Sequence, residues 1–184
     1  MTDPCDLPTL TVLKPIFVAD TLPALGPKPR PERMPMAELN HRLGTILNRS
    51  PLSTEAQALI RSMALLWHDH LDSSHALSQE IESADGSFLH GIMHRREPDY
   101  GNAKYWFGHV GAHPGFPEIA RRAGILLDSS DPDGLKHQLL PDGCWDAFAM
   151  VDAVERAAPS RNLLLQKIQR IEFEVLLERF CAQR

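Results

Sequence analysis

The chain has 184 residues, of which 43% are hydrophobic and 23% are charged, and its formal net charge is −5 at pH 7. This length can bury a substantial core and is too short to divide readily into two domains. The acidic balance argues against nucleic acid or an anionic membrane as a partner, because both select clustered Lys and Arg. There is no apolar run near the roughly 18 residues that span a bilayer and no export signal. We therefore expect a soluble cytoplasmic protein.

The cysteines set a limit on the chemistry of any metal site. Cys5, Cys144 and Cys181 are at unrelated spacings and form no CxxC pair. We interpret them as reduced thiols without a zinc-knuckle or redox motif. A metal site in this chain is then built from histidines and carboxylates.

Residues 1–35 are predicted to form a proline-rich N-terminal arm. They contain eight of the fifteen prolines, and each proline removes a backbone donor and restricts the residue before it. The apolar residues of the string LTVLKPIFVAD need cover, so we expect this string to lie across the core or to form a short extended piece. A single helical domain is predicted over residues 36–184.

The first two helices of this domain are predicted over residues 36–49 and 53–81. The first has leucine and isoleucine at spacings of three and four, and the second begins where Ser53 or Thr54 can cap it. The apolar stripe of the second helix contains His70. His68, Asp72 and His75 lie on its polar face.

A third helix is predicted from Asp85 or Ser87 to Arg96, where Pro98 stops it. Residues 128–143 form a turn-rich loop in this prediction, and further helices are expected over residues 102–111, 117–127, 144–157 and 160–183. No segment has the sustained alternation that is typical of strands. The sequence thus predicts a mainly α fold, a compact single-domain orthogonal bundle of about six to seven helices.

Seven of the nine histidines lie between Trp67 and His113. Two of them, His90 and His94, are separated by one helical turn, the spacing at which one helix offers two imidazoles to a metal ion. The zincin motif HExxH is absent because Gly91 takes the place of its glutamate. Since both histidines lie opposite an apolar stripe, a solvated helix face is the alternative interpretation.

The metal hypothesis combines His90 and His94 with a residue from the preceding helix, such as His70 or His75, around zinc or iron. Glu97, one turn further, is a candidate ligand or general base. His70 is a second catalytic candidate, because an unpaired buried imidazole costs about 1 to 3 kcal/mol. Alternatively, His70 is a core histidine that is hydrogen-bonded to a carbonyl or to Ser74.

A pocket for an organic anion is the second hypothesis. Arginines bind carboxylates and phosphates in a bidentate manner, and aromatic side chains wall pockets for planar ligands. The same aromatics could instead build core, and the arginines could form salt bridges within the chain. The residues predicted to line this pocket are Arg95, Arg96, Tyr105, Trp106 and His109.

Three strings, WHDH, HGIMHRREPD and NAKYWF, lie within residues 60–117. In these strings the chain resembles a family of uncharacterised soluble bacterial and fungal proteins, and the resemblance extends to the string WDAFAMVDAVE. It implies that the block acts as a unit. It assigns no substrate and no catalytic role to any residue.

Three functions remain open from the sequence. The first is a metal-binding protein or a metal-dependent hydrolase or oxidoreductase with zinc or iron. The second is a metal-free pocket for a small anionic molecule. The third is a structural or interaction domain whose proline-rich arm docks on a partner or on another copy of the chain.

Overall fold

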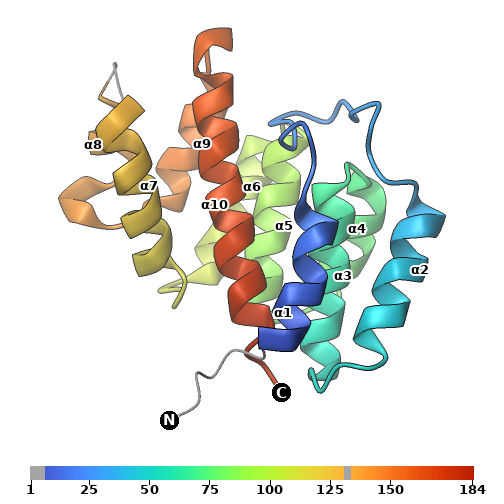
Figure 1. Ribbon diagram of the computed structural model, residues 1–184. Coiled ribbons are helices and arrows are strands. Elements are labelled where there is room, and N and C mark those ends of the chain that lie inside the picture. The colour runs from blue at the N-terminus through green and yellow to red at the C-terminus, as the bar shows by residue number, and fades with distance from the viewer. Residues whose placement is uncertain (1–6, 131–133) are drawn as a thin grey trace.

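The computed structural model of the protein describes residues 7–130 and 134–184, and this part of the chain contains ten α-helices, three short 3-10 helices and no strand (Figure 1). The prediction of a mainly α fold is confirmed, whereas the expected number of six to seven helices was too low. The α-helices are α1 (Leu7–Leu13), α2 (Met36–Leu47), α3 (Thr54–Trp67), α4 (Leu71–Ser78), α5 (Ala84–Arg96), α6 (Tyr100–Val110), α7 (Phe116–Ser130), α8 (Leu135–Leu139), α9 (Ala147–Glu155) and α10 (Asn162–Phe180). The 3-10 helices are η1 (Lys14–Phe17), η2 (Pro141–Gly143) and η3 (Pro159–Arg161).

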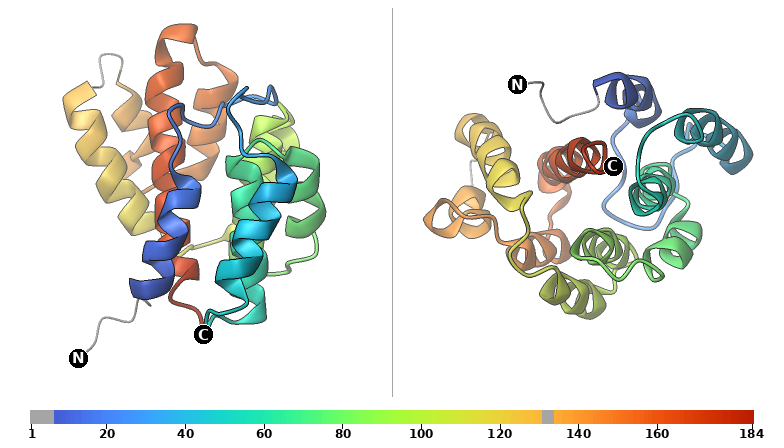
Figure 2. Two further views of the ribbon diagram at one scale, coloured as in Figure 1. Left: turned by 45° about the vertical axis from the view of Figure 1, so that its right-hand side comes forward. Right: turned by 90° about the horizontal axis from the view of Figure 1, so that it is seen from below.

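The long helices run roughly along one axis, so the expected orthogonal packing is not seen (Figure 1). Viewed from below, α1 to α6 follow one another around the outside of the molecule, α9 lies next to α6, and α10 lies near the middle (Figure 2). α10 packs against α3, α7 and α9, while α5 packs against α3, α4 and α6. No helix in the described ranges is both long and apolar enough to cross a membrane.

The N-terminal segment is helical at its start, and the expected extended piece was wrong. α1 and η1 follow each other directly and bury Leu13 and Ile16 in the core. Pro15 lies in the first turn of η1, where its missing N–H costs no hydrogen bond. A short helix thus provides the expected cover for Leu10, Leu13 and Ile16, whereas Val12 and Val18 are exposed.

The predicted helix over residues 53–81 is two helices. Ser53 caps α3 as expected, and its hydroxyl accepts a hydrogen bond from the amide of Ala56 at 3.2 Å. α3 then ends at Trp67, and α4 begins at Leu71. Between them Asp69 has a φ of 62°, which is outside the right-handed helical region. This break lets α4 leave the axis of α3 and pack against α5.

α5 lies in the middle of the packing, and every residue from Asp85 to Arg96 is buried. The alternative in which His90 and His94 occupy a solvated face is therefore wrong. Gly91 allows the close approach of α6, because a Cβ atom at this position would lie 2.9 Å from the ring of Phe107. The glutamate of a zincin motif has no room here.

The predicted loop over residues 128–143 is partly helical. α7 continues through Ser130, and α8 and η2 occupy Leu135–Leu139 and Pro141–Gly143. Residues 131–133 of the predicted loop lie outside the described residues.

Two buried ion-pair groups hold α5 to the rest of the fold. The guanidinium of Arg95 contacts Glu172 of α10 at 2.5 Å. The guanidinium of Arg96 contacts Asp69 at 2.6 Å, and Asp69 also pairs with Arg30 at 2.7 Å. The last pair ties the proline-rich segment to the break between α3 and α4. Such pairs hold a defined geometry, because separating the partners leaves a buried charge without compensation.

A third buried group lies at the N-terminal end of α5. The carboxylate of Asp85 accepts hydrogen bonds from His113 at 2.8 Å, Arg179 at 2.7 Å and Gln183 at 2.9 Å. Burial alone would raise the pKa of Asp85, but the bonds from His113 and Arg179 outweigh burial and lower this pKa to about 2. The ionised carboxylate therefore joins α5 to the C-terminal end of the chain.

Lowering the pH should lower the free energy of unfolding, because it protonates Asp85. Its pKa falls from 3.8 in the free residue to about 2 in the folded protein, so ionised Asp85 stabilises the fold above about pH 4. This contribution, about 2 kcal/mol, is lost as the pH falls from about 4 towards 2. Urea unfolding at pH 7 and at lower pH should show a smaller pH dependence for Asp85→Asn than for the wild type. Equal dependence in both proteins would contradict the assignment.

Candidate metal centre

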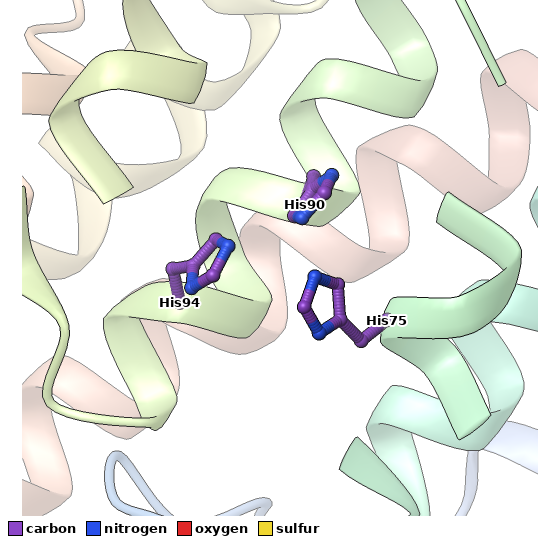
Figure 3. A group of neighbouring side chains, drawn as sticks. All are labelled: His75, His90 and His94. Carbon is purple, nitrogen blue, oxygen red and sulfur yellow. The ribbon is translucent and has the colours of Figure 1, made fainter. Parts of the chain in front are cut away.

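The structure brings three histidines together between α4 and α5 (Figure 3). His75 comes from α4, and His90 and His94 come from consecutive turns of α5. One ring nitrogen from each of the three lies within 4.8 Å of the others. It is the one such group of three metal-ligating side chains among the described residues.

The break between α3 and α4 brings His75 to this position. α4 runs beside α5, and its second turn carries His75 to the face of α5 that bears the other two histidines. In a continuous helix His75 would instead follow the direction of α3. The predicted ligand set is thus assembled by a helix break that the sequence analysis did not anticipate.

The imidazoles are held by ring stacking. His90 stacks on Trp106 of α6 with a centroid separation of 3.9 Å and an interplanar angle of 15°. His94 stacks on His90 at 4.8 Å. The ring of His75 lies edge-on to His90 at 4.7 Å and to His94 at 5.0 Å. Stacking fixes the planes of the rings but forms no hydrogen bond with their nitrogen atoms.

The unpaired nitrogen atoms are the most informative feature of the cluster. His90 is 2% exposed, and neither of its ring nitrogens has a hydrogen-bond partner in the described part of the chain. Nδ1 of His94 is also buried without a hydrogen bond, although it lies 3.4 Å from Oε2 of Glu97 and 3.9 Å from Oδ2 of Asp99. An unsatisfied buried polar group costs about 1 to 3 kcal/mol, so a partner outside the chain would relieve this cost.

Burial keeps the imidazoles of α5 neutral. Burial, with a smaller effect of the neighbouring His94 and His75, lowers the pKa of His90 to about 4. Burial and His75 also lower the pKa of His94, while Glu97 and Asp99 partly oppose this effect. Since a metal ion binds only neutral imidazole, the ring nitrogens of His90 and His94 are in the binding form at pH 7.

The histidine nitrogens lie somewhat further apart than they would around a bound zinc ion. Zinc binds imidazole nitrogen at about 2.0 Å in a tetrahedral arrangement, which places ligand nitrogens about 3.3 Å apart. The nitrogens here lie within 4.8 Å of one another, so the site needs a contraction of at most about 1.5 Å. His75 is half-buried, and it is the ligand with room to move.

The two candidate catalytic residues, Glu97 and His70, contact different parts of the protein. Glu97 is half-buried at the C-terminal end of α5 and faces His94. His70 points elsewhere, because its Nε2 bonds to the carbonyl oxygen of Met34 at 2.9 Å. His70 and Glu97 both line a cavity of about 320 Å³ at the start of α4. His68 was predicted on a polar face and is buried instead, with its Nε2 bonded to the carbonyl of Ile16.

The predicted anion pocket does not gather in one place. Arg95 and Arg96 are fully buried, and their guanidinium groups contact Glu172 and Asp69. An anion at these arginines would have to displace both carboxylates. Tyr105 and His109 lie on the surface of α6, where Nδ1 of His109 bonds to the carbonyl oxygen of Tyr105. Of the five predicted residues, Trp106 is the one whose ring contacts the histidine cluster.

The sequence analysis missed the role of Asp69. This residue lies between two histidines in the string WHDH, and no spacing rule marked it as the partner of Arg30 and Arg96. A signal was present in the sequence, because two adjacent arginines on a helix need carboxylate partners once they are buried.

Comparisons of the chain with protein-family models, with curated proteins and with solved structures find no match.

Proposed function

We propose that the protein binds one zinc or iron ion through His75, His90 and His94, and that it is a metal-dependent hydrolase or oxidoreductase. The observation that carries this proposal is the convergence of three imidazoles, in which both nitrogens of His90 and Nδ1 of His94 are buried without a hydrogen-bond partner in the described chain. Imidazole is the commonest metal ligand in proteins and suits both ions. The cluster supplies no thiolate, in keeping with the unrelated positions of the cysteines.

Three protein ligands favour a catalytic over a structural role. Structural zinc sites are closed by four protein ligands, whereas catalytic sites use three and keep a position open. A metal ion in such a site supplies a Lewis acid that polarises a bound substrate or activates water. The chain itself holds the imidazoles of His90 and His94 neutral and limits the access of solvent to them.

The carboxylates beside His94 fit the outer shell of a metal site. A ligating histidine usually donates its second N–H to a carboxylate, which fixes the tautomer and orients the ring. Nδ1 of His94 faces Glu97 and Asp99 at 3.4 and 3.9 Å. If Nε2 of His94 is the ligand atom, these carboxylates orient it. Glu97 is then a positioning residue, and its position also allows it to move a proton at the edge of the site.

The cavity beside Glu97 offers a place for a small polar substrate. Its volume is about 320 Å³, within the range of ligand pockets, and it lies between the start of α4 and the end of α5, where Glu97 faces His94. His70 lies in its wall and would contact a substrate there rather than the metal. The polar side chains that line this cavity are Arg33, Asp69, His70, Asp72, Ser73 and Glu97.

Elemental analysis tests the proposal. Tag-free protein purified without chelators should contain close to one zinc or iron per chain, and His90→Ala/His94→Ala should lose it. His109→Ala is the matched control, because His109 lies on the surface of α6 and outside the cluster; it should keep the metal. Circular dichroism checks that each variant is folded. Equal metal content in the wild type and the double variant, or no metal in either after reconstitution, would overturn the proposal.

A further inference from the structure

A second cavity lies between the N-terminal segment and α10, with Trp67 in its wall. Its volume is about 410 Å³, and it shares no lining residue with the histidine cluster. The walls come from α1, η1, residues 18–22, the end of α3 and one face of α10. The large apolar side chains of this lining are Leu10, Phe17, Leu22, Trp67, Phe173 and Leu177.

Three aromatic rings form one side of this cavity. The ring of Trp67 lies edge-on to Phe17, with centroids 5.9 Å apart, and edge-on to Phe173 at 5.3 Å. Such edge-on contacts fix ring positions and leave an apolar wall. Volumes of about 300 to 1,000 Å³ with mostly apolar walls and few polar groups are typical of small-molecule sites.

The charges at the rim leave one cation without a carboxylate. Arg170 pairs with Glu174 at 2.6 Å, and Glu178 pairs at 2.6 Å with Arg122. The remaining charged residue of the lining, Lys14, is exposed and forms no ion pair among the described residues. An apolar cavity with one free ammonium group at its rim complements an apolar molecule with a single negative charge.

We propose that this cavity binds a monocarboxylate with an aliphatic body, such as a medium-chain fatty acid. The carboxylate contacts Lys14 at the rim, and the aliphatic chain lies against Phe17, Trp67 and Phe173. Binding here is independent of the metal proposal, because the two sites have no residue in common.

Changing the chain length and changing the charge of the ligand test the apolar wall and Lys14 separately. Each methylene that leaves water contributes to binding, so decanoate should bind about 15-fold more tightly than octanoate. Decanol has the same chain as decanoate and no charge, and it should bind about tenfold more weakly than decanoate. Both comparisons use isothermal titration calorimetry at concentrations below the onset of micelles.

Two variants and a control locate the site. Lys14→Glu should weaken decanoate at least tenfold, because it places a like charge beside the carboxylate. Ala19→Trp fills the cavity from its half-buried surface segment and should abolish binding of both ligands. Lys28→Glu makes the same charge change at an exposed lysine that does not line the cavity, and it should leave the Kd unchanged.

The pattern of results decides the proposal. Saturable 1:1 binding of decanoate that is lost in Ala19→Trp and weakened in Lys14→Glu supports it. The absence of saturable binding to the wild type would overturn it, as would equal affinity for decanoate and decanol or an unchanged Kd in Lys14→Glu. Circular dichroism of Ala19→Trp separates a filled cavity from a misfolded chain.

Discussion

Replacing Asp69 with alanine should cost the protein about 3 to 5 kcal/mol of unfolding free energy. The carboxylate of Asp69 is fully buried and contacts Arg96 at 2.6 Å and Arg30 at 2.7 Å. Burial alone would raise the pKa of Asp69, but hydrogen bonds from Arg30 and the charge of Arg96 outweigh burial and keep it ionised. Alanine leaves both guanidinium groups in the interior without a counter-charge.

Urea unfolding of Asp69→Ala measures this loss, and Asp72→Ala is the matched control. Asp72 lies three residues away, and it is exposed with no ion pair among the described residues, so its removal should change stability by less than about 0.5 kcal/mol. Asp69→Gly should recover about 1 kcal/mol relative to Asp69→Ala, because glycine adopts a φ of 62° without strain. A loss below about 1 kcal/mol in Asp69→Ala would show that the buried pairs do not hold this break in place.

Metal binding, as proposed, should raise the stability of the fold by an amount that depends on metal concentration. A ligand that binds only the folded state adds about 4 kcal/mol when its free concentration is about 1,000 times its Kd. For a domain of this size, that gain raises Tm by roughly 8 to 16 °C. Differential scanning calorimetry of the metal-free protein, with and without buffered Zn²⁺, measures the shift.

The shift should vanish in His90→Ala/His94→Ala and return to baseline in the wild type when a chelator is added. His70→Ala tests the specificity of the effect, because His70 bonds to the carbonyl of Met34 and lies outside the cluster. It should keep the full shift. A shift of the same size in the double variant would place the stabilising ion elsewhere on the protein.

The helical class and most helix positions could be predicted from the sequence. Apolar residues at spacings of three and four mark α2, α7 and α10, and the capping hydroxyl of Ser53 marks the start of α3. These signals are local, because they depend on a helix burying one side of itself. The i, i+4 pair His90 and His94 was also predicted to meet a histidine of the preceding helix, either His70 or His75, and the structure brings His75 to them.

The break between α3 and α4 could not be predicted in the same way. It contains neither glycine nor proline, and the histidines and aspartate of the string WHDH continue an acceptable helical pattern. The break is held by tertiary contacts: Asp69 pairs with Arg30 and Arg96, and Arg30 donates a hydrogen bond to the carbonyl of Trp67. Partners up to 39 residues away supply these contacts, so no local rule reveals them.

The surroundings of α5 were mispredicted for a related reason. A helical wheel separates its apolar residues from His90 and His94, which suggests one buried and one solvated face. The polar side of α5 is buried as well, because α4, α6 and α10 supply imidazole, indole and carboxylate partners for it. The sequence of a single helix does not contain those partners.

The unequal burial of the three histidines bears on how a metal ion would enter and leave. His90 and His94 are fixed on a helix that is buried on every side, and such helices open only when much of the molecule unfolds. His75 is half-buried on the eight-residue helix α4, which has a free outer side. In the proposed metalloprotein, α5 would therefore hold His90 and His94 in fixed positions, and His75 would be the ligand that dissociates most readily. Exchange of the ion would begin with the outward movement of α4, at a rate set by that short helix rather than by the stability of the whole fold.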